Sequence, residues 1–306
     1  MADDNAEHRP IEDRIQKCYA TWGSTYFADY LGSNAAYPPV HFDHLRNLIG
    51  QSGAKSLLDA GCGPASFLRT VANDGVDLYG FDLTAEMVAE GKRVFADLSL
   101  DPDKLWQGSV LDAQSYVVPH GPSQYDAAVC IGVLPHVAEQ DEERVFKNLH
   151  RCVRPGGRVV IEARNQLFSL FTANRPTYEF IRDELIRATE LLSRAGSERG
   201  RCEEALETLK TQFRMDLPPV RRGKSGEPGY DEVLSRSHNP LTLKPRFEAA
   251  GFRDVNVLFY HFHALPPMLG AGVGDLFLRE SVAQENPTDW RGTFMASAFM
   301  LTGVST

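Results

Sequence analysis

A short apolar run that ends in a glycine-rich turn constrains the fold of this chain more than any other feature. Residues 56–60 form the run, and Gly61-Cys62-Gly63-Pro64 follows directly. The run predicts a buried strand, and the glycines predict a tight turn after it. Such a turn lets a ligand approach the backbone closely and presents free N–H groups to it. Asp59, near the end of the strand, suits a cationic amine or a pair of hydroxyls.

A second acid has the spacing expected of a ribose-binding residue. Asp82 follows the next predicted strand, residues 76–81, and lies 23 positions after Asp59. A carboxylate at this place accepts hydrogen bonds from both hydroxyls of a ribose. The same pattern is compatible with a dinucleotide-binding fingerprint, in which the third glycine position falls on Ser66. An NAD(P)-linked oxidoreductase therefore stays an alternative.

The chain continues as alternating strand and helix patterns. This alternation predicts an α/β fold with a mostly parallel sheet and helices on both faces. Ligands of such sheets bind at the carboxyl ends of the strands. The predicted strands are residues 56–60, 76–81, 105–110, 125–132 and 158–163, followed by two long strands at 255–263 and 294–303.

Five segments, in order and at ordinary spacing, resemble the motifs of class I S-adenosylmethionine (SAM)-dependent methyltransferases. They are LLDAGCGPASF, YGFDLTAEMV, Gly108–Asp112, Tyr125–His136 and Leu149–Gly157. The resemblance covers residues 40–164 and 245–303. It implies a Rossmann-like, seven-stranded sheet with an antiparallel C-terminal hairpin, and SAM as the cofactor.

The resemblance assigns residues to the methionine and ribose parts of SAM. Gly61 and Gly63 pass beneath the methionine part, and Asp59 orients this loop and the amino group. Ile131 contributes backbone near the methionine end. Asp82 holds the ribose.

The resemblance also assigns an adenine site. Leu83 and Met87 flank the ring, Leu111 supplies a backbone contact, and Asp112 accepts a hydrogen bond from the adenine amine. The alternative for Asp112 is a helix cap.

An aromatic segment near the N-terminus resembles the leading helix of small-molecule N- and O-methyltransferases, which closes over SAM. Residues 11–31 have a helical pattern that includes Tyr19, Trp22 and Tyr26. These rings are candidates for aromatic contacts to the sulfonium. The alternative is an amphipathic helix that packs on the core.

Histidines are the candidate general bases. A base adds about 10²–10⁴-fold to the rate when the methyl acceptor is a hydroxyl. His136 follows the fourth strand, and His238 stands in Ser237-His238-Asn239-Pro240 before the sixth strand. His261 and His263 alternate on one strand and so share a face. For each of them the alternative is a structural role.

The end of the fifth strand supplies candidate substrate contacts. Arg164 and Asn165 lie there, with Glu162 beside them. Arg164 is suited either to an acidic group of the substrate or to a structural ion pair.

A long insertion predicts a third part of the molecule. We expect an N-terminal helical segment (1–50) over the cofactor site, a SAM-binding core (51–164 and 246–306), and a helical lid at 165–245. Connections longer than about 12–15 residues usually serve a function. Glu139 and Asp141 are poor metal ligands, so no metal is expected.

Charge and composition narrow the partners. The net charge of −9 disfavours nucleic acid and anionic membranes as partners. The five cysteines have no CxxC spacing, the first residues lack a signal-peptide pattern, and no apolar run reaches about 18 residues. We expect a cytoplasmic protein with reduced thiols.

These observations predict a methyltransferase that acts on an oxygen or nitrogen atom of a small molecule, such as a natural product or modified sugar. DNA-base methylation is disfavoured, because Gly132-Val133-Leu134-Pro135 stands where an Asn/Asp-Pro-Pro-Tyr motif would lie. A non-catalytic SAM-binding protein is a further alternative.

Overall fold

The described residues of the computed structural model form two compact units. The description covers residues 9–23, 25–32, 34–118, 121–223, 228–270 and 272–306. Unit 1 comprises Met1–Arg164, Arg221–Leu258 and Phe299–Thr306, and unit 2 comprises Asn165–Val220 and Phe259–Ala298. Residues 1–8 of the expected N-terminal segment lie outside the described residues.

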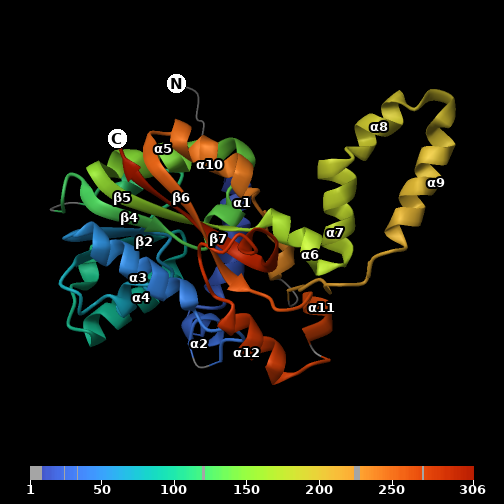
Figure 1. The fold of residues 1–306 in the computed structure, drawn as a ribbon. Helices are drawn as coiled ribbons and strands as arrows, with labels where there is room; N and C mark the ends of the chain where they lie inside the picture. The colour runs from blue at the N-terminus through green and yellow to red at the C-terminus, as the bar shows by residue number, and fades with distance from the viewer. Residues whose placement is uncertain (1–8, 24, 33, 119–120, 224–227, 271) are drawn as a thin grey trace. The chain divides into compact units, whose positions relative to one another are not determined.

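A seven-stranded sheet organises the described part of the chain (Figure 1). Its order is β3-β2-β1-β4-β5-β7-β6. The first five strands pair in parallel and the C-terminal strands are antiparallel, which confirms the predicted fold class. The strands are β1 (Ser56–Ala60), β2 (Asp77–Asp82), β3 (Leu105–Gln107), β4 (Tyr125–Cys130), β5 (Val153–Arg164), β6 (Phe252–Phe262) and β7 (Ala296–Ser305).

The strand order reverses at β1, and this reversal positions the functional site. From β1 the chain runs outward through β2 and β3, and then returns to place β4 on the other side of β1. Asp59 of β1 is in register with Gly80 of β2 and with Val129 of β4. The carboxyl ends of these three strands therefore meet at one edge of the sheet, where ligands of such folds bind.

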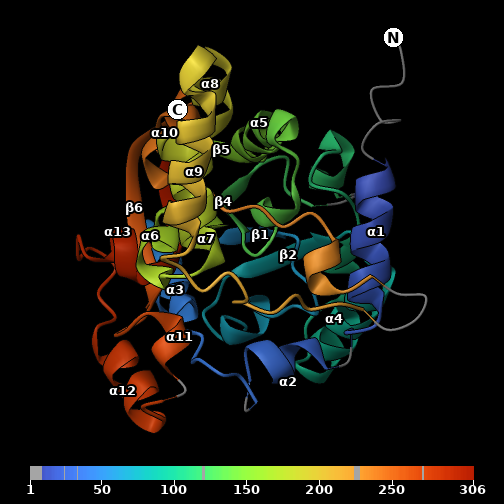
Figure 2. The same cartoon turned by 90° about the vertical axis from the view of Figure 1, so that its right-hand side faces the viewer.

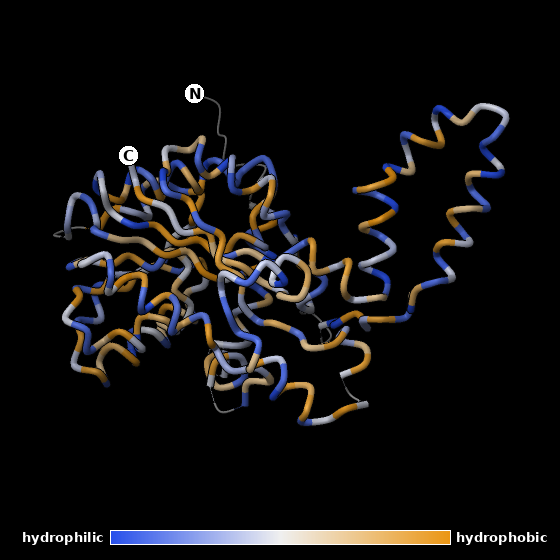
Figure 3. The backbone as a smooth tube through the Cα atoms, in the orientation of Figure 1, coloured by the Kyte–Doolittle hydropathy of each residue, from blue (hydrophilic) through white to orange (hydrophobic). Residues whose placement is uncertain are grey.

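Helices cover both faces of this part of the sheet (Figures 1 and 2). Helices α3 (Val40–Ser52) and α4 (Ala85–Asp97) lie on one face, and α5 (Glu142–Cys152) and α10 (Pro240–Ala249) lie on the other. Each helix buries apolar side chains; Phe146 of α5 and Phe247 of α10 pack edge to face, with ring centroids 5.4 Å apart. Figure 3 shows that hydrophobic residues also gather along the strands of the sheet.

Several predicted elements are shorter or interrupted. The predicted helix at 11–31 is two helices, α1 (Arg9–Ala20) and α2 (Tyr26–Tyr30). The predicted strand at 105–110 ends at Gln107. Gly108 N–H still donates to the Asp82 carbonyl of β2, but Ser109 N–H donates to the Ser115 hydroxyl and leaves the strand ladder.

Between β1 and β2 the apolar residues at 67–72 form only one 3₁₀ turn, Leu68–Thr70. Gly75 follows with a positive φ of 72°, and the chain turns into β2 there.

Unit 2 contains the predicted insertion, with different bounds. Residues 221–245 belong to unit 1. Residues 259–298 belong to unit 2; they comprise the end of β6, the connection that follows it and the start of β7. This second segment contributes three helices that the sequence analysis missed: α11 (Pro267–Gly270), α12 (Asp275–Ala283) and α13 (Gly292–Met295). The expected lid role of residues 165–245 stays a prediction.

The first segment of unit 2 is a charged helical hairpin. It begins with α7 (Arg175–Phe180), which a π-turn (Ile181–Leu185) separates from α8 (Ala188–Arg194). Helix α9 (Arg199–Lys210) then runs back toward the start of α7, where Asn174 and Arg214 form a backbone bridge. Hydrophilic and hydrophobic residues alternate along these helices (Figure 3). None of the helices in the described ranges has the length and apolar character needed to cross a membrane.

Candidate active site

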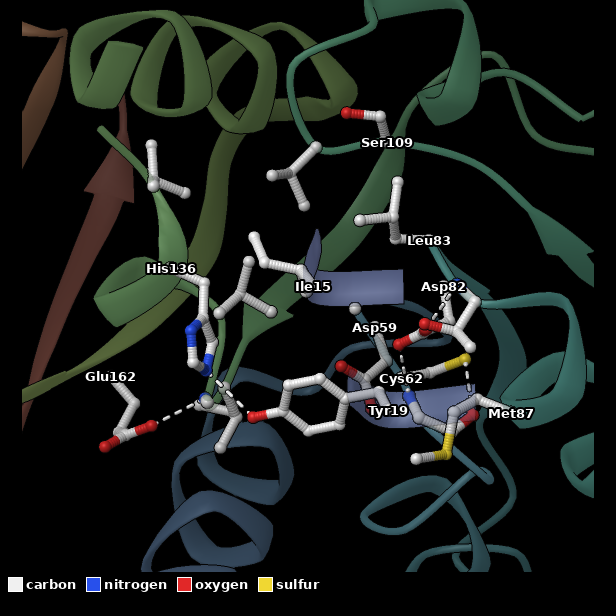
Figure 4. Close-up of a pocket in the computed structure, with 18 of the residues that line it drawn as sticks. Ile15, Tyr19, Asp59, Cys62, Asp82, Leu83, Met87, Ser109, His136 and Glu162 are labelled. Atoms are coloured by element: carbon white, nitrogen blue, oxygen red, sulfur yellow. Dashed lines mark hydrogen bonds between the residues drawn. The ribbon is translucent and has the colours of Figure 1, made fainter. Parts of the chain in front are cut away.

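A cavity of about 250 Å³ lies in unit 1 at the carboxyl ends of β1, β2 and β4. Figure 4 shows it, with His136 and Glu162 on one side and Ser109 and Leu83 on the other. The structure brings most of the predicted cofactor residues together here. Those that line the cavity are Tyr19, Tyr26, Asp59, Gly61, Gly63, Asp82, Leu83, Met87, Leu111 and Ile131, together with His136.

The glycine turn after β1 is the tight turn that the sequence predicts, but the N–H groups of Gly61, Cys62 and Gly63 bond within the protein and are not free for a ligand. Gly61 and Gly63 have positive φ angles of 91° and 53°. A Cβ on Gly61 would lie 2.2 Å from the Val133 side chain. The N–H groups of Gly61 and Cys62 both donate to the Phe81 carbonyl, at 2.8 and 2.9 Å. Glycine at position 61 therefore lets the turn lie against the loop after β4.

The Asp82 carboxylate is held by backbone N–H groups of two segments that line the cavity. Its Oδ2 accepts the Gly63 N–H and its Oδ1 accepts the Thr84 N–H, both at 2.9 Å. Burial raises the pKa of this carboxyl, and these backbone bonds oppose that effect. Each oxygen keeps a lone pair for a further donor. The arrangement suits two neighbouring hydroxyls, such as those of a ribose.

Asp59 is a buried acid that awaits a partner. Its side chain is 3% exposed, and Oδ1 has no hydrogen-bond partner among the described residues. Burial, with the nearby charge of Asp82, raises the pKa of Asp59 to about 8. A buried polar atom without a partner is costly. A cationic amine in the cavity would supply both the missing donor and the missing charge.

His136 is held between two hydrogen bonds. Its Nδ1 lies 2.6 Å from the Leu234 carbonyl oxygen, which can only accept, so Nδ1 carries the proton. Its Nε2 then accepts from the Tyr19 hydroxyl at 2.8 Å. Burial lowers the pKa of His136 to about 4, against the effect of the Leu234 bond and with a smaller contribution from Arg164. His136 is thus neutral at pH 7, and the lone pair on its Nε2 accepts the hydrogen bond from Tyr19.

The cavity lining also includes Glu162, which the sequence places beside Arg164, and residues to which the sequence assigns no role, such as Ser109, Glu12 and Ile15. Glu162, at the end of β5, is 7% exposed and accepts the Gly132 N–H at 2.5 Å. Ser109 follows β3, and Glu12 and Ile15 come from α1. The signal for the last two was present in the sequence. Glu12, Ile15 and Tyr19 have the spacing of one helix face.

Trp22 does not line the cavity, unlike its neighbours Tyr19 and Tyr26 in the described part of the chain. Its ring stacks on Tyr230, with centroids 5.9 Å apart, and meets Tyr19 edge to face at 5.2 Å. Trp22 packs against Tyr19, which lines the cavity, and does not line the cavity itself. Its expected contact with the sulfonium is therefore not supported.

Asp112 has the alternative role, that of a cap. It is exposed and does not line the cavity, and its Oδ1 accepts the Gln114 N–H at 3.0 Å at the start of a 3₁₀ turn, Ala113–Tyr116. The expected bond to the adenine amine is therefore not supported. The capping bond turns this carboxylate toward the chain that follows it.

Arg164 and Asn165 are engaged in structural contacts. Arg164 lies over the Tyr230 ring, 4.9 Å from its centroid, and donates to the Ser235 hydroxyl. The Asn165 amide donates to the carbonyls of Thr293 and Ala296, both at 2.9 Å, and more distantly to that of Gly292. Its oxygen accepts the N–H two residues further on, at 3.1 Å. The substrate role expected for Asn165 is not supported, because its side chain is fully used.

His238 lies in a buried ion-pair network away from the cavity lining. Its Nε2 donates to Glu142 Oε1 at 2.9 Å, and Arg246 donates to Glu142 Oε2 at 2.6 Å. Arg236 also binds Glu142. Burial acts to raise the pKa of Glu142, but these partners hold it below its usual range. A catalytic role for His238 is not supported by this placement.

His261 and His263 share a face, as predicted, but belong to unit 2. Their rings stack with centroids 5.1 Å apart. Burial lowers the pKa of His261 to about 4 and, together with His261, that of His263 to about 3. His263 also packs against Phe168, at 4.7 Å between centroids. Neither histidine lines the cavity described above.

Comparisons with known proteins agree with this site. The sequence model of a methyltransferase domain matches residues 58–159. A ubiquinone biosynthesis O-methyltransferase of Pseudomonas aeruginosa (strain UCBPP-PA14) is 24% identical over 230 residues, which cover 72% of this chain and 83% of that protein. The protein of the same name from Klebsiella pneumoniae (strain 342) is 27% identical over 128 residues, 42% of this chain; the match spans only 50% of the relative's length.

A solved structure shows the same fold. The DhpI complex with S-adenosylhomocysteine (SAH) superposes with a TM-score of 0.51 at 15% identity, covering 97% of this chain and 98% of that one. The matched domain and the seven-stranded fold are those of class I SAM-dependent methyltransferases. Residues 58–159 match the methyltransferase domain, and the cofactor is SAM.

The cavity fits this cofactor. SAM carries an amino group, two ribose hydroxyls and an adenine ring. Among the described residues Asp59 has a buried acceptor without a partner, and Asp82 has two fixed acceptors. Leu83 and Met87 provide apolar walls.

Proposed function

We propose that this chain transfers the methyl group of SAM to an oxygen or nitrogen atom of a small molecule, with a hydroxyl as the first acceptor to test. The observation that carries the proposal is Asp59, a buried acid whose Oδ1 has no partner in the described part of the chain. It lies beside a glycine turn and a second acid, Asp82, at the ends of adjacent strands. Asp59 is a suitable acceptor for the amino group of SAM, and Asp82 is a suitable acceptor for its two ribose hydroxyls.

The chemistry divides between the cofactor and the chain. SAM supplies an activated methyl on a sulfonium, so the protein has chiefly to bind, orient and exclude water. Asp59 and Asp82 orient the two ends of the cofactor. Tyr19 and Tyr26 cover the cavity with aromatic rings and limit the access of water.

His136 is the proposed base for a hydroxyl acceptor. Its Nε2 carries no proton at neutral pH, but Tyr19 occupies it. Tyr19 must therefore turn away, or an acceptor hydroxyl must replace it, before His136 takes a proton. Because the pKa of His136 is about 4, its contribution falls near the low end, about 10²-fold.

The choice of a small-molecule hydroxyl rests on the relatives. The curated relatives that align with 72% of this chain are named as O-methyltransferases of ubiquinone biosynthesis. A natural product or modified sugar remains the proposed acceptor class.

Two measurements test the function. Isothermal titration calorimetry should show binding of SAM and SAH, and none of NAD(P)H. Incubation with methyl-labelled SAM and small-molecule extracts of the producing cell should then label a compound that mass analysis identifies. Binding of NAD(P)H in place of SAM would contradict the proposal, and SAM binding without transfer to any acceptor would indicate a non-catalytic SAM-binding protein.

A further inference from the structure

The adenine end of the cavity lacks the acid that the resemblance placed there. Asp112 is exposed and caps the turn that follows it. The amino group of adenine is a donor that needs an acceptor when it is buried. An acceptor must therefore come from another element if the proposed function, on which this inference rests, is correct.

Glu12 of α1 supplies a carboxylate at this end. It lines the cavity together with Ser109, Leu111 and Leu83. The Ser109 hydroxyl donates to Glu12 Oε1 and accepts the Leu111 N–H at 3.0 Å. The Leu111 N–H thus donates to the Ser109 hydroxyl, and this hydroxyl donates to the Glu12 carboxylate. The carboxylate accepts the last hydrogen bond of this series.

A second contact fixes α1 at the same place. Gln16, one helical turn after Glu12, donates from its amide to the Leu83 carbonyl at 2.8 Å. Leu83 follows Asp82, whose carboxylate suits the ribose. Glu12 is thus held between the end of β3 and the end of β2, the two segments that flank the expected adenine site.

We infer that Glu12, rather than Asp112, accepts the hydrogen bond of the adenine amino group and selects adenine as the base of the cofactor. Ser109 uses one lone pair of the Glu12 carboxylate, and further lone pairs remain on its two oxygens. An amine donates to such an acceptor. A carbonyl oxygen at the same position of the base is repelled by it, so the site discriminates against a 6-oxo purine.

The test compares two ligands that differ at this atom. Calorimetric titrations of the full chain with SAH and with S-inosylhomocysteine, its 6-oxo analogue, measure the preference for the amine. The wild-type protein should prefer SAH by about tenfold or more, the size expected for a charged hydrogen bond. Glu12→Gln should reduce this preference about tenfold. Asp13→Asn, on the exposed side of the same helix, should leave it unchanged.

The outcomes separate this inference from the proposed function. No SAH binding by the wild-type protein would overturn both. SAH binding with a preference that Glu12→Gln leaves intact, or an equal loss of both ligands, would overturn the role of Glu12 alone. If Glu12→Gln does not fold, judged by circular dichroism, Ser109→Ala takes its place and should lower the preference because Glu12 loses its anchor. An unchanged preference in Ser109→Ala would then count against the inference.

Discussion

At the scale of single residues, the cavity is defined by acids and a histidine whose surroundings shift their protonation. Asp59 is buried with an unpartnered oxygen, and His136 is buried between Leu234 and Tyr19. Burial favours the neutral form of both. The neutral Asp59 can ionise to pair with a bound cation, and the neutral His136 has a lone pair that can accept a proton. Two predictions follow from these states.

The affinity for SAM should depend on the charge of Asp59. In the free protein its pKa is about 8, so below pH 8 the carboxyl is mostly protonated and must lose its proton to pair with the ammonium of SAM. Affinity should therefore rise with pH from 6 to 8, by up to about tenfold per unit. Above about pH 8 the α-amino group of the ligand loses its own charge.

Calorimetry in two buffers of different ionisation enthalpy measures this proton release directly. At pH 6.5 the wild-type protein should release close to one proton on binding. Asp59→Asn should bind more weakly at pH 8 and lose the rise between pH 6 and 8. Equal pH profiles of the variant and the wild-type protein would show that Asp59 is not the group involved.

The turnover on a hydroxyl acceptor should depend on His136. His136→Ala should lower kcat by about 10²-fold with little effect on the affinity for SAM. A base must be unprotonated, and the pKa of His136 is about 4 rather than the usual 6.5. The titration of His136 should thus leave the wild-type rate unchanged from pH 6 upward and lower it only as the pH drops toward 4. Wild-type turnover in His136→Ala would remove it as the base, and an amine acceptor would show a small effect.

At the scale of elements, a buried acid ties three segments of unit 1 together. Glu142 is fully buried at the start of α5. It binds Arg236 and His238 from the segment before α10, and Arg246 within α10. The same segment, at Leu234, holds His136. The ion-pair network therefore positions the histidine of the cavity through the backbone between them.

Removal of this acid should destabilise the fold. Glu142→Ala removes an acceptor from two arginines and a histidine, of which Arg236 keeps Glu139 as a partner, and breaking a buried pair costs about 3–5 kcal/mol. The arginines are partly exposed, at 23% and 33%, so we expect the lower end, about 3 kcal/mol, in urea unfolding. Glu143→Ala, the exposed neighbour, should change stability by less than about 0.5 kcal/mol.

The pH dependence has a defined sign. The folded-state pKa of Glu142 lies below its usual value, so its contribution is present above the unfolded pKa of about 4.3. It is lost as pH falls through the lower folded pKa. The stability difference between wild-type and Glu142→Ala proteins should thus shrink only below about pH 4. A difference that shrinks near pH 7 would contradict this assignment.

At the scale of the whole molecule, the described cavity lies within unit 1, and unit 2 contributes none of its lining. The cofactor and the predicted lid are therefore separable by experiment. The backbone bridge between Asn174 and Arg214 brings the ends of the charged hairpin together. A short linker can replace the hairpin between these points.

Excision of residues 181–211, joined by a short Gly/Ser linker, tests the predicted lid role. Binding of SAM should stay within about threefold of wild type, or about 0.7 kcal/mol, because residues 181–211 do not line the described cavity. Methyl transfer should be lost if the hairpin serves the acceptor. Loss of SAM binding together with transfer would mean that the hairpin supports the core, and full transfer would remove the lid role.

The sequence by itself determined the parallel core and the cofactor turn. Continuous apolar runs, the Gly61–Gly63 turn and the spacing of Asp59 and Asp82 are local patterns, and local backbone chemistry dictates them. The tertiary structure alone decided which polar side chains reach the cavity. Asp112 turned to cap its own chain, Asn165 and His238 found structural partners, and Glu12 reached Ser109 from 97 positions away. A pattern along the chain cannot assign such partners, because a polar group bonds to whatever the packing of distant elements brings beside it.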